Sequence, residues 1–208
     1  MNFAIAFDFD GVIIDSIQCL KKTYYDFLND FGFEGNESEF NSLNGPSLHE
    51  IISILSKTYP INIAHKELLE RYKKMLKTAY SDAPLMDGAL ECLSFFKKEQ
   101  IFVSLVTSSM RSEVDLLLKK HDISDFFDQI VTGDDVTNSK PSPEIYLKIK
   151  EKFPELSFWV VEDSRNGIIA ANKAKMNVIF FDKDNIGTDI QVDKRINSLA
   201  QLKCLINE

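Results

Sequence analysis

The sequence predicts an α/β protein in which helices cover both faces of a parallel sheet and a separate helical segment is inserted. Three observations support this prediction. Phe3–Phe7 is a short apolar run without charge, as in a strand buried in the middle of a parallel sheet. From Ile101 onward, strand-like and helix-like segments alternate, which is typical of a parallel sheet covered on both sides. Residues from about 16 to 80 show no strand pattern.

Apolar spacing and turn residues predict the individual elements. After the first strand, Asp15 or Ser16 is expected to cap a helix that runs from Ile17 to Phe31, and a weakly patterned stretch follows over Phe33–Asn44. Further helices are expected over residues 48–55, 68–79, 88–96, 110–121, 143–153, 165–175 and 198–206, and further strands over 101–106, 129–131, 158–161 and 178–181. We therefore expect a core domain of residues 1–15 and 84–208 and a helical cap domain of residues 16–83.

Composition limits the class of protein. A chain of 208 residues with 44% hydrophobic residues is long enough for one packed domain and an insertion. The net charge of −8 argues against nucleic acid or an acidic membrane as a partner. No stretch approaches the roughly 18 apolar residues of a membrane span, and no signal-peptide pattern is present. The three cysteines are far apart, so reduced thiols in a cytoplasmic protein are expected.

Two acids follow the first strand. Side chains two positions apart in an extended chain point the same way, so Asp8 and Asp10 are expected on one face, with Phe9 on the other. Gly11 permits a sharp turn and a close approach of a ligand to the backbone. Adjacent carboxylates repel each other and persist where a cation or a shared proton offsets that repulsion. The alternative is that Asp8 and Asp10 are two solvated acids before a glycine turn. Only partner residues elsewhere in the chain can decide between the two interpretations.

Polar side chains also follow the later strands. Thr107-Ser108-Ser109 could cap the next helix or bind an oxyanion, and Lys140 is either a solvated charge or an ammonium held between prolines. Glu162-Asp163 adds a second acidic pair after a buried run. Ligands bind at the carboxyl ends of parallel strands, so we treat these residues as one site. An oxygen-rich site of this kind suits Mg²⁺, which would let an anionic phosphate approach an anionic nucleophile.

This set of motifs resembles the haloacid dehalogenase superfamily of phosphotransferases. Asp8-Phe9-Asp10-Gly11-Val12 is similar to the first motif of that family, and Thr107 to the second. Lys140 in Lys-Pro-Ser-Pro is similar to the third motif and Glu162-Asp163-Ser164 to the fourth, in the order of the family. The resemblance covers almost the whole chain and is strongest to the branch of phosphoglycolate-phosphatase-like and β-phosphoglucomutase-like enzymes. It implies a Rossmann-like core with the active site under the cap.

The resemblance also implies a role for each motif residue. Asp8 would attack phosphorus and form an aspartyl-phosphate, and Asp10 would serve as general acid and then as general base. Lys140 would neutralise charge on the phosphoryl group and orient Asp8, and Thr107 would bind a phosphoryl oxygen. Gly11, Ser108 and Ser109 are the further residues expected at the substrate. Mg²⁺ would be held by Asp8, the Asp10 carbonyl and Asp163, with Glu162 as a further candidate ligand.

The leading hypothesis is therefore a Mg²⁺-dependent phosphatase of a small phosphorylated metabolite. A phosphosugar mutase is the alternative. Mutases of this branch carry a histidine and an arginine in the cap, at positions that look equivalent to Leu20 and Leu48 here. A dehalogenase is disfavoured, because that chemistry dispenses with the metal and with the second aspartate. A catalytically silent binding protein is the third possibility, and the intact motifs argue against it.

Overall fold

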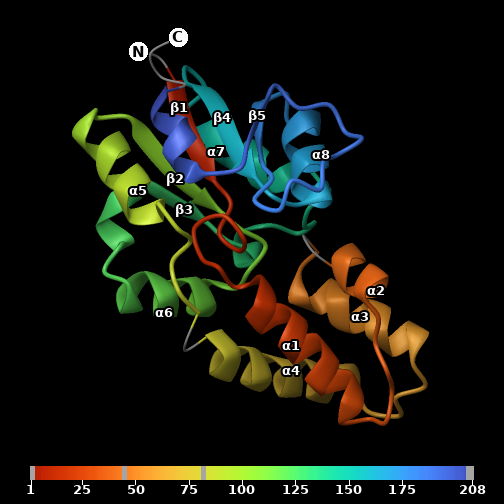
Figure 1. Ribbon diagram of the computed structural model, residues 1–208. Coiled ribbons are helices and arrows are strands. Elements are labelled where there is room, and N and C mark those ends of the chain that lie inside the picture. Colours follow the sequence, from red (N-terminus) through yellow and green to blue (C-terminus); the bar gives the residue numbers. More distant parts are fainter. Residues whose placement is uncertain (1–2, 44–45, 81–82, 205–208) are drawn as a thin grey trace.

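The structure is a computed structural model, and it describes residues 3–43, 46–80 and 83–204. Figure 1 shows a body built on a sheet and, below it, a group formed by the helices α1 to α4. The strands are β1 (Phe3–Phe7), β2 (Phe102–Val106), β3 (Gln129–Val131), β4 (Ser157–Glu162), β5 (Asn177–Phe181) and β6 (Lys194–Ile196). The helices are α1 (Ile17–Asn29), α2 (Glu37–Ser42), α3 (Leu48–Thr58), α4 (His65–Tyr80), α5 (Ala89–Lys98), α6 (Arg111–Lys120), α7 (Glu144–Lys152) and α8 (Arg165–Lys173). Short 3₁₀ turns cover Ser124–Phe126, Gly133–Asp135 and Leu199–Cys204.

The sheet is parallel throughout, in the order β3-β2-β1-β4-β5-β6. The chain fills one side of β1 with β2 and β3 and then crosses to the other side with β4, so the strand order reverses beside β1. Phe7 pairs with Leu105 of β2 on one side and with Val161 of β4 on the other. The carboxyl ends of these three strands therefore lie together, which is where parallel sheets bind ligands. The predicted α/β fold with a central first strand is confirmed.

Alternating side chains of β1 face the two layers of helices. Ala4 and Ala6 belong to the buried cluster that includes residues of α7 and α8. Ile5 and Phe7 belong to the larger cluster, which includes residues of α5 and α6. Because both faces are covered, the strand is apolar along its whole length, which is why it could be recognised from sequence.

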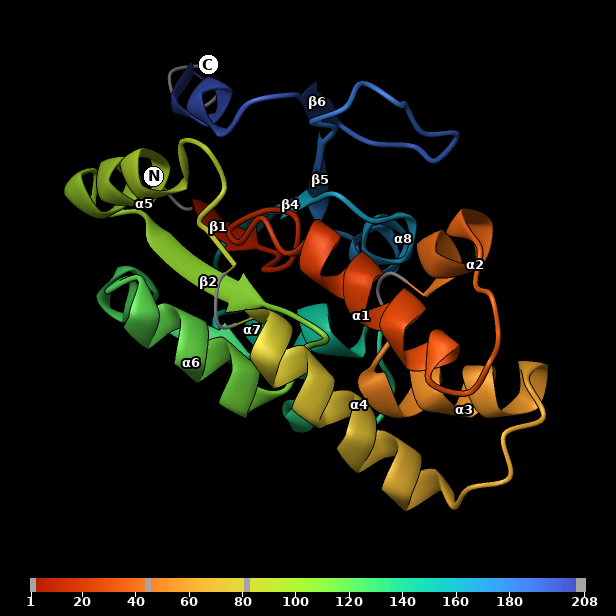
Figure 2. The same cartoon turned by 60° about the horizontal axis from the view of Figure 1, so that its bottom comes forward.

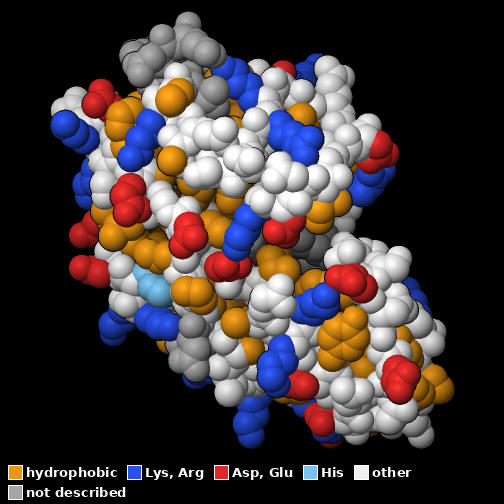
Figure 3. Space-filling model, in the orientation of Figure 1, with side chains coloured by type: hydrophobic (Ala, Val, Ile, Leu, Met, Phe, Trp, Pro, Cys, Tyr) orange, Lys and Arg blue, Asp and Glu red, His pale blue; other side chains and the backbone are white. Residues whose placement is uncertain are grey.

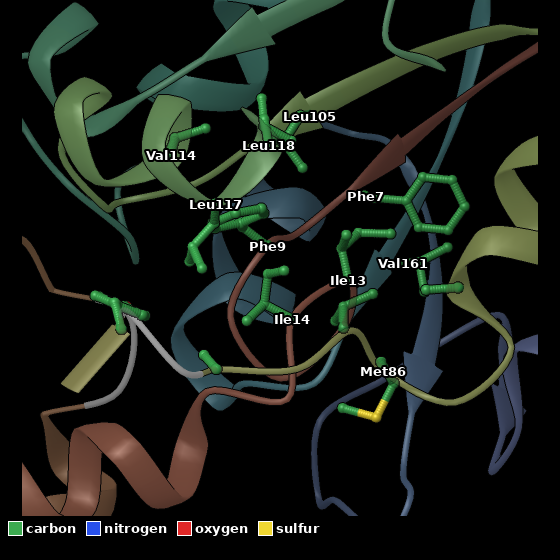
Figure 4. Close-up of a cluster of buried hydrophobic side chains, with 14 of the residues drawn as sticks. Phe7, Phe9, Ile13, Ile14, Met86, Leu105, Val114, Leu117, Leu118 and Val161 are labelled. Atoms are coloured by element: carbon green, nitrogen blue, oxygen red, sulfur yellow. The ribbon is translucent and has the colours of Figure 1, made fainter. Parts of the chain in front are cut away.

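The turn after β1 is fixed by burial of its apolar residues. Phe9, Ile13 and Ile14 are at most 1% exposed and share a buried cluster with Leu117 of α6 (Figure 4). The Phe9 carbonyl accepts hydrogen bonds from the N–H groups of Ile13 and Ile14, each at 2.9 Å. Gly11 has φ = +79°, a conformation that strains any residue with a Cβ. This packing holds the acids on either side of Phe9 in place.

Helices α1 to α4 form a unit with its own aromatic contacts. Figure 2 shows α1 lying along α4, and the rings of Phe27 and Tyr72 meet there at 4.9 Å between centroids. Buried residues of this unit are continuous with the cluster under β1, so the unit packs onto the core. None of the described helices combines the length and apolar character that a membrane crossing requires.

The structure adds elements that the sequence pattern missed. Helix α2 has a single large apolar residue, Phe40, and therefore no periodicity, although Asn36 caps it by accepting the Glu39 N–H at 2.9 Å. Strand β6 has three residues and pairs with β5 at the sheet edge. The described part of the expected C-terminal helix is a 3₁₀ helix ending at Cys204, and residues 205–206 lie outside the described residues. Ser16 occupies the N-cap position of α1, but its side chain makes no capping hydrogen bond.

Candidate active site

The strand register brings the predicted residues of the first, second and fourth motifs to one edge of the sheet. Asp8 follows β1, and its N–H donates to the Val161 carbonyl of β4 at 3.0 Å. Thr107 follows β2 on one side of Asp8, and Glu162 and Asp163 end β4 on the other. The convergence is a direct result of the parallel pairing, because equivalent positions of neighbouring strands end at the same edge.

Lys140 reaches this edge from the loop before α7 and is 2% exposed. Its Nζ lies 2.5 Å from Asp8 Oδ1 and 2.6 Å from Glu162 Oε1, and it also donates to the Val106 carbonyl at 3.2 Å. The ammonium therefore donates to three buried oxygens from three strands. The interpretation of Lys140 as a solvated loop charge is wrong, and the expected contact with Asp8 is present.

Burial and the neighbouring charges shift the pKa values of Asp8 and Lys140. Burial raises the pKa of Asp8 to about 8, and the negative charge of Glu162 adds to that effect while Lys140 opposes it. Burial alone would lower the pKa of Lys140, but the charges of Asp8 and Glu162 raise it above its ordinary value. Lys140 is thus cationic near neutral pH, and a further cation near Asp8 would favour its ionised form.

Glu162 is fully buried and has several hydrogen-bond donors. Besides Lys140, the Tyr146 hydroxyl donates to Oε1 at 2.6 Å and the Ser164 hydroxyl donates to Oε2 at 3.0 Å. The first turn of α8 packs against this carboxyl, since a Cβ added at Gly167 would lie 2.0 Å from it. These contacts fix the Glu162 carboxyl beside Lys140.

Three acids form a group that could hold a metal ion. Ligand atoms of Asp8, Glu162 and Asp163 all lie within 4.8 Å of one another. Asp163 Oδ1 is buried without a hydrogen-bond partner, and burial together with the charges of Asp8 and Glu162 raises the pKa of Asp163 well above its ordinary value. Gly11 leaves room for this side chain, because a Cβ there would lie 2.1 Å from Asp163 Oδ2. An unpaired, buried oxygen within an acidic cluster fits a hard divalent cation.

Asp10 accepts hydrogen bonds from three hydroxyl groups. Ser16 and Tyr80 donate to Oδ1 at 2.5 and 2.7 Å, and Ser109 donates to Oδ2 at 2.6 Å. Ser109 was expected at the site, whereas Ser16 and Tyr80 were not. Tyr80 is the last residue of α4, and helical spacing gives no sign that its hydroxyl turns toward the core. Ser16 follows Asp10 closely in the chain, but it was interpreted only as a helix cap.

The hydroxyl segment after β2 does not cap the next helix. Met110 occupies the N-cap position of α6, and Thr107 Oγ1 accepts the Ser109 N–H at 3.0 Å. Thr107 is 2% exposed and lines the same cavity as Ser108 and Ser109. The capping interpretation is therefore wrong, and the hydroxyls lie beside the acids instead.

Two cavities meet the acidic edge. One, of about 90 Å³, lies between the motif residues and the helices α1, α3 and α4, and both Leu20 and Leu48 line it. The other, of about 480 Å³, is lined by Gly11, Asp163 and the chain around Asp182. A notch on this side of the molecule, between α2 and α8, is visible at the right of Figure 3. The helical unit thus forms a wall of a site whose polar floor belongs to the core.

The parallel sheet thus carries a lysine-bound aspartate, a second aspartate and an acidic cluster at its carboxyl edge, where α/β proteins bind their ligands. Residues 5–181 match the model of the haloacid dehalogenase-like hydrolase family, and the chain belongs to that family. A phosphorylated carbohydrates phosphatase of Thermotoga maritima is 32% identical over 85% of this chain and 83% of its own length. Hexitol phosphatase B of Escherichia coli is 26% identical over 96% of this chain and 93% of its own. The prediction of a phosphatase-type enzyme of this family is confirmed.

Solved structures of the family share the fold. CbbY from Rhodobacter sphaeroides in complex with phosphate has a TM-score of 0.82 and 21% identity, over 97% of this chain and 96% of its own. A β-phosphoglucomutase from Clostridium difficile also has a TM-score of 0.82, with 24% identity, over 100% of this chain and 96% of its own. These similarities support the arrangement of sheet and helices.

Replacing Lys140 tests the buried ion group. Lys140→Met is expected to lower the free energy of unfolding by about 3–5 kcal/mol, because Asp8 and Glu162 stay buried without their counter-charge. The Asp8 carboxyl then binds its proton more tightly in the folded than in the unfolded chain, so the loss is larger at about pH 8 than at about pH 5. Urea unfolding at both pH values measures the loss, with the exposed Lys148→Met on α7 as the control. Equal losses in both variants, or a loss that shrinks as pH rises, would contradict this assignment.

Proposed function

We propose that this protein is a Mg²⁺-dependent phosphatase that hydrolyses phosphomonoesters of a small metabolite through an aspartyl-phosphate on Asp8. The observation that carries the proposal is the contact of Asp8 with Lys140, 2.5 Å long, at the floor of a cavity that Asp10 also lines. The names of the two relatives, phosphatases of phosphorylated carbohydrates and of a hexitol, support a phosphorylated carbohydrate as the kind of substrate. A cytoplasmic location suits the three cysteines, which form no disulfide within the described part of the chain.

The proposed reaction has two displacements at phosphorus. In the first, an Asp8 carboxylate oxygen forms a bond to phosphorus while the ester oxygen leaves and takes a proton from Asp10. In the second, water attacks phosphorus, Asp10 accepts a proton from that water, and the bond from phosphorus to Asp8 breaks. Inorganic phosphate is released and both carboxyls return to their starting states. Splitting one difficult displacement in two is the advantage of the covalent route.

The neighbours of each acid suit these roles. Lys140 lies against Asp8, where it would balance the charge that builds up on the phosphoryl group. Ser16, Tyr80 and Ser109 hold the Asp10 carboxyl by both oxygens, so the proton donor has a fixed direction. Thr107 and Ser108 line the cavity beside Asp8 and would donate hydrogen bonds to phosphoryl oxygens. Gly11 has no side chain that would prevent the ligand from approaching the backbone.

Asp8 and Asp163 are the residues that would hold Mg²⁺, together with the Asp10 carbonyl. Glu162 was a further candidate, and we propose that it acts instead through Lys140, because its oxygens accept from Lys140, Tyr146 and Ser164. When bound, the cation would offset the repulsion between the acids and an anionic phosphate. We also propose that residues 16–83 form a cap domain and residues 1–15 and 84–208 the core, with the leaving group held between them.

A phosphosugar mutase is the second candidate, and the cavity argues against it. A mutase must hold a distal phosphate and return the phosphoryl group to the same substrate. Leu20 and Leu48, at the positions that look equivalent to the mutase histidine and arginine, both line the cavity and cannot bind phosphate. With those groups absent, water reaches the aspartyl-phosphate, and hydrolysis is the expected outcome.

Substitution of the nucleophile is the first test of the phosphatase. Asp8→Asn is expected to reduce phosphate release from p-nitrophenyl phosphate to below about one hundredth of the wild-type rate, because an amide is a poor nucleophile. Circular dichroism should show an unchanged fold. Asp125→Asn, at an exposed position, is the control and should keep full activity. A variant at position 8 that retains more than this rate would exclude Asp8 as the nucleophile.

Removal of the metal is the second test. Exhaustive chelation should abolish activity and added Mg²⁺ should restore it, because the acids would otherwise repel the substrate. Isothermal titration calorimetry should show Mg²⁺ binding that weakens at least about 10-fold in Asp163→Ala, since loss of a ligand oxygen lowers affinity. Asp125→Ala should bind as the wild type does. Full activity after chelation would refute the metal requirement.

The balance between hydrolysis and isomerisation is the third test. The protein is incubated with β-glucose 1-phosphate, Mg²⁺ and a trace of glucose 1,6-bisphosphate, and glucose 6-phosphate and free phosphate are followed together. We expect free phosphate without isomerisation, because Leu20 and Leu48 offer nothing to a distal phosphate. Efficient conversion to glucose 6-phosphate with little phosphate release would establish the mutase.

A further inference from the structure

The cavity above Asp8 has two unlike walls. Its floor is polar, as described above. The wall formed by α1 to α4 is apolar apart from two tyrosines, and none of its described lining residues is charged. The aliphatic side chains of this wall are those of Ile17, Leu20, Leu43, Leu48, Ile51 and Leu76. A hydroxyl of the leaving group that faced this wall would lose its hydrogen bonds to water without replacement.

Glu113, in the first turn of α6, is a charged residue of the core that also lines this cavity. The residue is 8% exposed and therefore buried. Oε2 accepts the Met110 N–H at 3.3 Å, which is an ordinary helix-capping contact. Oε1 is buried and has no hydrogen-bond partner among the described residues. Capping therefore explains one oxygen of this carboxyl and leaves the other unexplained.

The nearby charged groups do not satisfy this oxygen. Lys73 on α4 is close enough for its charge to act on Glu113, but its Nζ donates to Glu70 Oε1 at 3.1 Å. Asp10 and Asp134 are acids and cannot donate when ionised. Burial raises the pKa of Glu113 to about 7, because the charged form of the carboxyl is disfavoured away from water. Buried acceptors normally have a donor, so an unpaired oxygen on a residue that lines a cavity points to a ligand.

We propose that Glu113 Oε1 accepts a hydrogen bond from the leaving group of the substrate. The substrate class is then a phosphomonoester whose leaving group carries a hydroxyl or ammonium donor at one position and is otherwise apolar where it meets α1 to α4. This inference rests on the proposed phosphatase function, since it describes what that site selects. It narrows the substrate from phosphorylated carbohydrates in general to those with few donors on the cap side.

Matched esters provide the test. Phosphate release is measured with propyl and butyl phosphate and with the same esters bearing a terminal hydroxyl or amino group. At one chain length, kcat/KM for a donor-bearing ester is expected to exceed that of the plain ester by at least about 10-fold, as a hydrogen bond to a charged, buried acceptor implies. The comparison of hydroxyl with amino esters identifies which donor the site prefers.

Two substitutions then assign that preference to Glu113. Glu113→Leu should bring the ratio between matched esters close to one, because no acceptor remains. Glu113→Gln keeps an acceptor and a capping side chain, so the preference for the hydroxyl ester should persist and that for the amino ester should fall. Glu50→Leu is the control, since Glu50 caps α3 in the same way by accepting the Ser47 N–H at 2.8 Å but is exposed. It should leave the ratio unchanged.

The ratio of kcat/KM values separates substrate recognition from general damage to the protein, because a loss of folded enzyme lowers the rate with both esters by the same factor. Glu113→Leu could fail to fold. If the wild type prefers the amino ester, a fall of the amino-ester ratio in Glu113→Gln then tests the inference. If the wild type prefers the hydroxyl ester, Glu113→Ala takes the place of the leucine variant. Hydrolysis of the esters without a donor preference at any length, or a preference that survives loss of the Glu113 carboxyl, would overturn the inference alone. Absence of phosphate release from every ester and from p-nitrophenyl phosphate would overturn the proposed function together with it.

Discussion

The ion group of Lys140, Asp8 and Glu162 is the constraint on which the rest of the site depends. Burying these charges is costly, and a buried cation beside two carboxylates persists only with close geometry and further hydrogen bonds. The chain provides them: the Val106 carbonyl accepts from Lys140, and Tyr146 donates to Glu162. Because the partners come from β1, β2, β4 and α7, the requirement to satisfy one ammonium fixes how these elements sit relative to one another.

A second set of contacts ties the helical unit to the chemistry. Asp10 belongs to the core, but Tyr80 ends α4 and Ser16 precedes α1, so two of its three donors lie where the chain passes between core and helical unit. A change in the packing of that unit against the core would therefore alter the direction of the Asp10 carboxyl. The Asp10 carboxyl is thus positioned by residues at the boundary between the core and the helical unit.

Local pattern predicted the strands β1 to β5 and the motifs because their causes are local, whereas the three-residue edge strand β6 gave too short a pattern. Phe3–Phe7 is apolar on both faces, and the acids follow it directly, so composition and spacing were enough. Helix α2 was missed because Phe40 alone gives no period, although Asn36 offered a capping signal. The role of Tyr80 could not be predicted, since its hydroxyl meets Asp10 only through tertiary packing. Mg²⁺ ligation and the domain boundaries stay predictions that the acidic cluster and the helix positions make reasonable.

Asp10 and Glu113 show how the fold treats two acids in one cavity differently. Asp10 has donors on both oxygens, which fixes the direction of its carboxyl, as the proposed role in acid–base catalysis requires. Glu113, which lines the same cavity, has a donor on one oxygen only, and the other is buried without a partner among the described residues. A protein that satisfied Glu113 internally would gain stability but lose an acceptor for its ligand. The unpaired oxygen lowers the stability of the folded protein. We attribute this loss to ligand binding, since the proposed substrate supplies the missing hydrogen bond.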